Sequence, residues 1–380
     1  MIVQHFLKWI DTARVADRAA AANALARAYI VSDLDFEDRC AAEAALTLLL
    51  DDPSPKVRLA MAEALKLSPR APQQIVAALA ADQPEVAAPL LALSPVLGDN
   101  DLIDLVAASS AAAQGLIASR ARVSMALSAA IAEVGEPEAC VALLHNPGAE
   151  IASVSFRRIA ERQGGLAPVR EALVTHPALP SETRHALVIS LGEVLTTSPL
   201  VTALMGKARA ERLMREACTR ASLTLIDGTR QVEFAALVEH LRMRGDLTTG
   251  FLVRVIAHGK IDFFGAALVA LSGQPESRVR ALLSGGRDTA LSALFRAAKL
   301  PAGTHAAVLR ALSVWREVAR GKRVAGAQEV SYMMLRCLQD ARGEAVDPVD
   351  CGGLANLIKS IHLEALRENA RGHALAIAAA

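Results

Sequence analysis

The sequence has few aromatic residues, few cysteines and no long uncharged apolar segment. Aromatic residues make up 3% of the 380 residues, although hydrophobic residues make up 53%. Ligand pockets are usually lined by aromatic side chains, so this scarcity argues against a large ligand pocket. Much of the apolar content is alanine, the best helix former, and alternation of apolar and polar residues at period two is hard to find. The composition predicts an all-α protein.

The five cysteines form no metal-binding or disulfide pattern. They contain no CxxC pair and no accompanying histidine cluster, and we expect them to be small buried thiols. They are Cys40, Cys140, Cys218, Cys337 and Cys351.

The nine histidines are scattered along the chain, which favours surface or helix-capping roles over metal binding. His176, His185 and His305 fall at predicted turns or helix starts, and His240 and His258 near helix ends. No metal and no cofactor is expected.

Motifs of the common enzyme classes are missing. The sequence contains no GxxxxGK[ST], GxGxxG, HExxH, GxSxG or EF-hand pattern. The segment 284–287, Ser-Gly-Gly-Arg, is the nearest to a phosphate loop, but no predicted strand precedes it, so we interpret it as a tight turn between helices. The sequence therefore predicts a protein that is not an enzyme.

Nothing in the sequence indicates a membrane span. The longest uncharged runs, Leu105–Ser119 and Val194–Gly206, are shorter than the ~18 residues that suggest a span. The first residues lack the apolar core and cleavage site of a signal peptide. We expect a cytoplasmic protein.

The net charge of +1 hides an asymmetry between the two halves. Residues 1–200 contain 16 Lys and Arg against 23 Asp and Glu, whereas residues 201–380 contain 25 against 17. Such a division suggests an anionic partner for the C-terminal half or association of unlike ends, unless both faces are merely solvated.

A short repeat is the clearest pattern in the chain. In residues 42–65, AEAALTLLLDDPSPKVRLAMAEAL, an apolar helical segment ends at an Asp-Asp-Pro turn and a second helix follows. Similar turns recur with Pro84, Pro147 and Pro177, at spacings of 31, 63 and 30 residues from Pro53 onward. The doubled middle spacing indicates one repeat, near residues 100–122, without its proline. Such helix pairs are stable only when stacked on their neighbours.

The turn residues predict specific contacts. Asp or Asn before the second helix can cap its free N–H groups, and Pro fits near the first helical position. Arg58 is expected to bridge to an acidic turn residue of the next repeat, which in a stack gives a polar ladder.

After residue 196 the pattern changes. Residues 200–225 are predicted to form one long helix, supported by the i,i+4 pairs Glu211/Arg215 and Glu216/Arg220. Further helices are predicted near 230–243, 248–258, 261–272, 288–298, 303–319, 327–341 and 352–370. The predicted domains are 1–39, N-terminal capping helices; 40–196, repeats; and 197–380, a C-terminal helical region with further repeat-like units.

These segments resemble known families. Leu48–Leu65 and Ala126–Leu144 are similar to the short HEAT-like repeats also found in phycobilisome lyases. Ala266–Leu283, AALVALSGQPESRVRALL, and 290–301, ALSALFRAAKLP, resemble a bacterial family catalogued as domain of unknown function 2336, with likeness from about Cys40 to Leu338. The resemblance implies a superhelical solenoid of short HEAT-like helix pairs with a less regular helical C-terminal region. It implies no activity and no catalytic residues.

Two enzyme hypotheses follow from HEAT-like folds, tetrapyrrole attachment and alkylpurine DNA glycosylase activity. Both need aromatic residues around an acid–base group, and Trp9, Trp315, Tyr29 and Tyr332 are far apart in the sequence. We therefore expect a scaffold or adaptor that binds another protein along a solenoid surface, with nucleic-acid or anion binding by the basic C-terminal half as the alternative. The candidate contact residues, chosen for charge density, are Arg157, Arg158, Arg242, Arg244, Arg316, Arg320, Lys322 and Arg323.

The N-terminal segment is apolar on more than one side. Residues 1–12 include Phe6 and Trp9, two of the few aromatic residues. This segment is expected to cap the first repeat. The alternative is self-association through the same helix, because tryptophan is frequent at interface hot spots.

Overall fold

The computed structural model describes residues 9, 12–340 and 348–379, and the chain divides into two units. Unit 1 is Met1–Thr183 and unit 2 is Arg184–Ala380. The described residues form helices and turns, with one isolated parallel bridge between Val123 and Ala149. The all-α prediction is confirmed for these residues. Most of the N-terminal segment for which a cap or a dimer contact was predicted lies outside them.

Unit 1 contains short helices joined by tight turns. They are α2 (Val15–Val31), α3 (Phe36–Leu49), α4 (Pro55–Leu65), α5 (Gln73–Ala80), α6 (Pro84–Leu93), α7 (Asp99–Ala108), α8 (Ala111–Ala118), α9 (Met125–Val134), α10 (Pro137–His145), α11 (Ser153–Gln163) and α12 (Ala167–Thr175).

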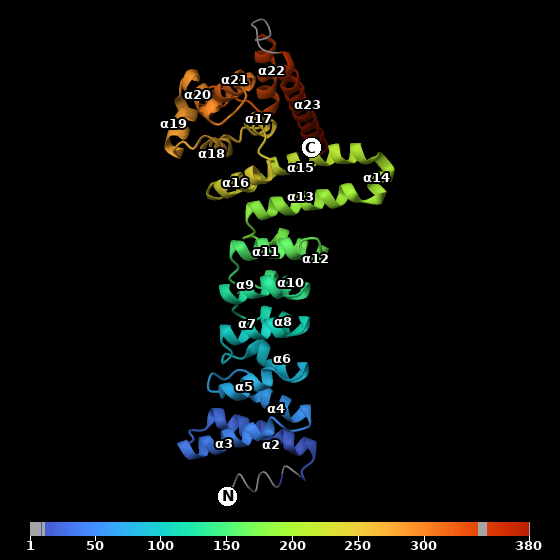
Figure 1. Cartoon of the computed structure of the whole chain (residues 1–380), viewed down its shortest axis with the longest axis vertical. Helices are drawn as coiled ribbons and strands as arrows, with labels where there is room; N and C mark the ends of the chain where they lie inside the picture. Colours follow the sequence, from blue (N-terminus) through green and yellow to red (C-terminus); the bar gives the residue numbers. More distant parts are fainter. Residues whose placement is uncertain (1–8, 10–11, 341–347, 380) are drawn as a thin grey trace. The chain divides into compact units, whose positions relative to one another are not determined.

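The helices of unit 1 stack in two layers (Figure 1). One layer contains α2, α4, α6, α8, α10 and α12, each packed on the next, and α7, α9 and α11 pack in the same way in the other layer. Buried aliphatic side chains fill the space between the layers, among them Met61, Leu90 and Ile131. Each helix pair therefore buries its apolar side against its neighbours, as stacked repeats require.

Proline begins three helices of unit 1, although of the repeat's turn prolines only Pro84 does so, and the predicted capping is wrong for two turns. Pro55, Pro84 and Pro137 hold the first positions of α4, α6 and α10. The carboxylate of Asp52 accepts a hydrogen bond from Ser54 N at 2.8 Å, within the turn and before the helix. Asp82 likewise accepts from the adjacent Gln83 N, so neither carboxylate caps a first-turn N–H group.

The predicted polar ladder is confirmed across consecutive turns of unit 1. Arg58 Nη2 donates to Asp82 Oδ1 at 3.0 Å, and Arg58 Nε donates to the other oxygen of the same carboxylate. One step earlier, Arg18 Nε donates to Asp52 Oδ2 at 2.7 Å, and Arg58 also donates to the Asp52 carbonyl. The side chains are mostly buried, so each arginine ties one turn to the next at a site with little competing water.

The ladder predicts an acid-sensitive contribution to the stability of unit 1. The hydrogen bond from Arg58 lowers the pKa of Asp82 below its ordinary value, so this stabilisation is complete above about pH 4 and is lost as the pH falls through the folded-state pKa. Asp82→Asn should cost about 1 kcal/mol at pH 7, since Arg58 keeps its bond to the Asp52 carbonyl.

Thermal melting followed by circular dichroism at pH 7 and pH 3 tests this. The difference between wild type and Asp82→Asn should shrink at the lower pH. An equal difference at both pH values would contradict the role of the carboxylate charge.

Unit 2 begins within α13, and its helices are less regular. They are α13 (Ser181–Thr197), α14 (Pro199–Met205), α15 (Lys207–Gly228), the 3₁₀ turn η1 (Gln231–Glu233), α16 (Phe234–Arg244), α17 (Thr249–Ala257), α18 (Ile261–Ser272), α19 (Glu276–Gly285), α20 (Asp288–Ala297), α21 (Ala302–Ala319), α22 (Ala327–Asp340) and α23 (Pro348–Ala379).

The long helix predicted over residues 200–225 is wrong. The chain breaks at Gly206, which has a φ of 78°, so that α14 and α15 are separate helices. Glycine adopts this conformation without the steric cost that other residues meet.

No single helix of the described residues is long and apolar enough to cross a membrane. Helices α13 and α14 reach that length and apolarity only when they are taken together, and the pair is bent by 65°.

Phenylalanine is concentrated in the core of unit 2. Five of the eight Phe lie between residues 234 and 295, and Phe251, Phe263, Phe264 and Phe295 are buried. Phe263 contacts Phe234 edge to face, and Phe264 contacts Phe295 in the same way. Larger side chains suit a core in which helices cross irregularly, whereas the stack in unit 1 is filled mainly by aliphatic residues.

The structure divides the chain at residues 183/184, whereas the sequence suggested 196/197. The reason lies in α13, which contacts other helices of unit 2 at His185 and Gly192. His185 hydrogen-bonds to His240, and a Cβ at Gly192 would lie 2.8 Å from Cys218 Sγ.

Candidate functional site

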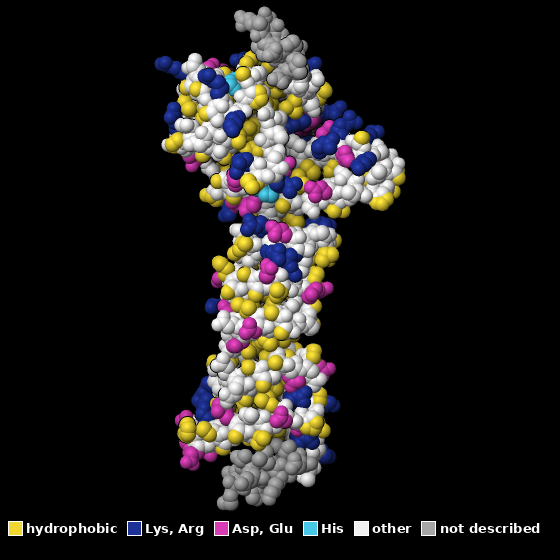
Figure 2. Space-filling model, in the orientation of Figure 1, with side chains coloured by type: hydrophobic (Ala, Val, Ile, Leu, Met, Phe, Trp, Pro, Cys, Tyr) yellow, Lys and Arg dark blue, Asp and Glu magenta, His cyan; other side chains and the backbone are white. Residues whose placement is uncertain are grey.

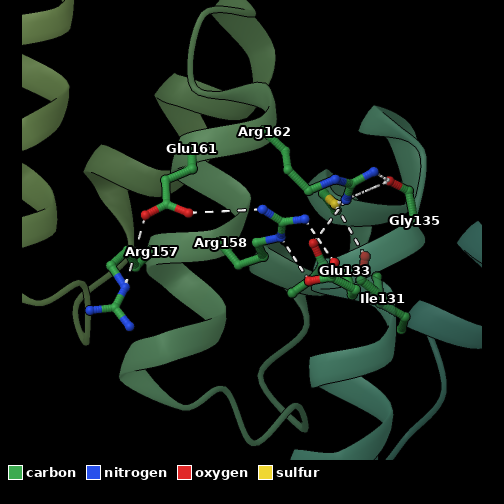
Figure 3. Close-up of polar contacts among 9 residues, drawn as sticks. Ile131, Glu133, Gly135, Arg157, Arg158, Glu161 and Arg162 are labelled. Atoms are coloured by element: carbon green, nitrogen blue, oxygen red, sulfur yellow. Dashed lines mark hydrogen bonds and ion pairs between the residues drawn. The ribbon is translucent and has the colours of Figure 1, made fainter.

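Two of the candidate contact arginines lie on α11 in unit 1, where carboxylates surround them (Figure 3). Arg158 Nε and Nη2 donate to the two oxygens of Glu133 at 2.7 Å, and this hydrogen bonding lowers the pKa of Glu133. Arg157 lies 4.0 Å from Glu161 and its side chain is 63% exposed. Arg157 is thus the more available of the two for a partner.

Three candidates in unit 2 are also paired with carboxylates. Arg242 and Arg244 lie at the end of α16, and Arg323 lies in the turn before α22. Their charges are partly neutralised within the unit, which weakens them as phosphate contacts. The pairs are Arg242 with Glu239, Arg244 with Asp246, and Arg323 with Glu329 and Glu317.

Arg316 binds backbone carbonyls and is partly buried. From α21 it donates to the carbonyl oxygens of Leu282 at 2.7 Å, Leu283 at 2.8 Å and Gly286 at 3.2 Å. These oxygens lie at the end of α19, where a helix runs out of its own N–H donors; the Leu282 oxygen also accepts from Gly286 N at 2.8 Å. Burial lowers the pKa of Arg316. The geometry identifies Arg316 as a helix-terminating side chain.

The same use of arginine occurs twice in unit 1. Arg120 donates to the Leu91 carbonyl at 2.7 Å and to that of Ser94 at the end of α6. Arg162 donates to the Ala132 carbonyl at 2.8 Å at the end of α9. In both units, an arginine from a later helix or turn thus hydrogen-bonds to the last carbonyls of an earlier helix.

Arg320 and Lys322 differ from the other candidates because they are exposed and also form no ion pair with a carboxylate of the described residues. Arg320 stands at the end of α21 and lines the opening of a groove, whereas Lys322 lies in the turn that follows. Of the eight candidates, the structure brings only Arg316 and Arg320 to one concave site.

This concave site is the α16–α21 groove, with a volume of about 460 Å³. Helices α16, α18, α19 and α21 and the turn η1 form its walls. Its lining is mainly apolar, and no histidine or cysteine of the described residues lines it. The apolar lining residues are Phe234, Ala235, Ile261, Gly265, Ala266, Val269, Val279, Leu283, Leu312, Trp315 and Ala319.

Trp315 is held in a fixed orientation in the groove wall. Its Nε1 donates to the Ile256 carbonyl at 2.8 Å, at the end of α17. Gly259, with a φ of 77°, lies directly against the indole ring, and a Cβ there would be 2.9 Å from Trp315 Cη2. The ring therefore presents an apolar surface to the groove at little conformational cost.

Acidic and basic side chains both lie on the rim of the groove. Arg280 Nη2 donates to Glu276 Oε1 at 2.7 Å, and both side chains are exposed. Asp262 and Arg320 are also exposed. The rim is therefore polar around an apolar floor, the usual organisation of a binding interface.

Gly265 lies on the α18 side of the groove and keeps it open. A Cβ there would lie 3.2 Å from Leu283 Cδ1, so a larger side chain would enter the space that now separates α18 from α19. The groove depends on this small residue.

A second cavity of unit 2, about 570 Å³, lies beside His185. Ser222 Oγ donates to the Cys218 carbonyl at 2.8 Å, so it accepts from His185 Nε2, and His185 Nδ1 then accepts from His240 Nε2 at 3.2 Å. Burial lowers the pKa of His185 to about 4. In this arrangement the serine hydroxyl donates to its own helix and not to His185.

Some sequence predictions about polar residues and pockets are wrong. His185 and His305 are buried, and Cys40 is exposed, whereas Cys140 is buried as expected. The side chain of Cys351 lies outside the described residues. The low aromatic content did not exclude a sizeable groove, because aliphatic side chains line most of it.

The groove was missed by sequence reasoning, although one signal was available. Trp315 is one of only two tryptophans, and it lies one helical turn before Ala319 and Arg320 on α21. A partly exposed tryptophan beside an unpaired arginine is a common composition of interface hot spots.

Comparison with known proteins gives one match. A family model described as an uncharacterised protein conserved in bacteria, DUF2336, matches residues 86–346, a range that includes the whole groove. No curated protein and no solved structure matches the chain. Since the match covers more than half of the sequence, the chain belongs to the DUF2336 family.

Proposed function

We propose that this protein is a non-enzymatic adaptor that binds an apolar helical segment of a partner protein in the α16–α21 groove. The observation that carries the proposal is the groove itself, an open apolar concavity of about 460 Å³ with a fixed indole in its wall. An amphipathic helix laid in an apolar groove between helices is a recurring mode of peptide recognition.

The rim supports a partner segment with a polar outer side. Arg320 is exposed and unpaired among the described residues, so an acidic residue of the partner at that end gains a charge-assisted contact. Arg280 and Glu276 already pair with each other and add little selectivity. The preferred segment thus has apolar residues at helical spacing and an acidic residue near one end.

The described lining of the groove supports binding more than catalysis. Its one hydroxyl, that of Ser284, donates to the Ala281 carbonyl at 3.0 Å, and no described histidine or cysteine is near enough to line the site. Nucleic-acid binding, the alternative from the sequence, is less favoured because most candidate arginines pair with carboxylates or carbonyls.

Gly265→Leu tests the proposal directly. The leucine side chain should occupy the groove and weaken partner binding about tenfold or more, while helix propensity offsets the crowding against Leu283. The measurement is affinity capture by the immobilised full-length chain from nuclease-treated native lysate, followed by titration of the captured protein.

Gly228→Leu is the matched control. Gly228 is also helical and exposed in unit 2, and a Cβ there meets no atom within 4 Å. A protein retained by wild type and Gly228→Leu but lost with Gly265→Leu supports the proposal. Binding unaffected by Gly265→Leu contradicts it, and capture that nuclease abolishes would favour the nucleic-acid alternative.

A further inference from the structure

The hairpin of α13, α14 and α15 carries apolar side chains at its tip that no described residue covers. Leu200 and Leu204 are 68% and 74% exposed, and Val194, at the end of α13, is 59% exposed. Leu200 and Leu204 are four residues apart on α14 and therefore project from the same side of that short helix. Several large exposed apolar side chains so close together indicate an interaction surface.

Basic side chains without partners adjoin this tip. Lys207, Arg209 and Arg212 begin α15, all three are exposed, and none pairs with a carboxylate of the described residues. Within residues 198–215 the only acidic residue is Glu211, which lies 4.0 Å from Arg215. The tip is therefore apolar and carries a net positive charge, unlike the end of α16, where the arginines are paired.

The tip protrudes from unit 2 as the α13–α15 hairpin (Figure 1). Figure 2 shows hydrophobic side chains around the α14 turn and basic side chains over neighbouring α15. The cavity between α13 and α15 is lined by their inner sides, including Gly192 and Met214, and neither Leu200 nor Leu204 lines it. A convex apolar surface flanked by unpaired basic side chains is complementary to the boundary between lipid headgroups and acyl chains.

We propose that this hairpin tip docks on the surface of an anionic lipid bilayer. Leu200 and Leu204 enter the outer acyl region, and Lys207, Arg209 and Arg212 contact lipid phosphates. The two contributions support each other, since a few apolar side chains or a few cations alone give only weak membrane binding. The groove of unit 2 is not part of this contact, so the two proposals fail or hold independently.

The test is co-sedimentation of the full chain with vesicles of equal parts phosphatidylglycerol and phosphatidylcholine, compared with vesicles of phosphatidylcholine alone. Wild type should bind the anionic vesicles and lose binding as salt rises. The double substitution Leu200→Asp and Leu204→Asp should weaken binding about tenfold or more. Replacing Lys207, Arg209 and Arg212 by glutamine should weaken it and reduce its salt dependence.

Leu67→Asp is the matched control, since Leu67 is an exposed leucine in unit 1. It should leave vesicle binding unchanged, and circular dichroism should show that every variant keeps its helical content. Absence of wild-type binding, or an equal loss with Leu67→Asp, overturns the proposal. A wild-type dimer that the double substitution converts to a monomer, without vesicle binding, assigns the tip to self-association and also overturns it.

Discussion

Replacing Arg316 with alanine is expected to lower the free energy of unfolding of unit 2 by about 3 kcal/mol. The substitution removes three hydrogen bonds to the carbonyls of Leu282, Leu283 and Gly286, and of these only the Leu282 carbonyl keeps a backbone donor among the described residues, Gly286 N at 2.8 Å. Hydrogen bonds from a charged donor contribute roughly 1.5–3 kcal/mol each to stability. Because the site is only partly buried, water can hydrogen-bond to some of the freed carbonyls in the variant, so the expected loss is smaller than the sum of the three bonds. The result would identify Arg316 as a structural residue of the groove wall.

Trp315 fluorescence provides the measurement. In a Trp9→Phe background it is the only tryptophan, so equilibrium denaturation followed at this residue reports on unit 2. Arg320→Ala is the matched control on the same helix and should change stability by less than about 0.5 kcal/mol. Equal effects of the two substitutions would contradict the assignment. Arg316→Lys should lose less stability than Arg316→Ala, because lysine keeps the positive charge but lacks the planar guanidinium group that can bind several carbonyls at once.

Acidification from pH 7 to pH 4.5 is expected to destabilise unit 2 by about 2 kcal/mol through His185 alone. Burial lowers its pKa to about 4 from the ordinary 6.5, and the neighbouring His240 and Arg244 act in the same direction while Asp246 opposes them. Between these values the unfolded chain binds a proton that the folded chain does not. The stabilisation is complete above about pH 6.5 and is lost as the pH falls towards the folded-state pKa.

His185→Gln separates this contribution from other acid effects. Glutamine can still donate to Ser222 and accept from His240 but does not titrate. The variant should show a loss of stability between pH 7 and pH 4.5 that is smaller than that of wild type by about 2 kcal/mol, measured by Trp315 fluorescence at both pH values. An unchanged loss in the variant would show that His185 is not the titrating group.

The repeat contacts of unit 1 could be predicted from sequence because they are local and recurrent. The arginine that follows the prolines of one turn reaches the carboxylate of the next turn, and the Arg58–Asp82 pair has this arrangement. Proline at the helix starts follows from its missing N–H group, which has no partner in the first turn of any helix. The positions of these residues therefore required no knowledge of distant contacts.

The groove could not be predicted in the same way. Its apolar residues, such as Ile261, Ala266 and Val269, recur at helical spacing like those of a core, and only the irregular arrangement of the unit 2 helices leaves them partly uncovered. Charge density in the sequence does not distinguish Arg316 from Arg320. In the structure, Arg316 hydrogen-bonds to the carbonyls at the end of α19, whereas Arg320 is exposed. The break at Gly206 was missed because favourable charge pairs on α15 suggested a continuous helix.

The most direct test of the proposed adaptor function is photo-crosslinking from Ser284, an exposed residue of the groove lining. A benzophenone amino acid is placed there in the full chain, expressed in its native cells, and the crosslinked peptides are identified by mass spectrometry. The account predicts one partner segment with apolar residues at helical spacing, whose crosslink is lost with Gly265→Leu and kept with Gly228→Leu. Crosslinks that persist in Gly265→Leu, or that involve only nucleic acid, would contradict it.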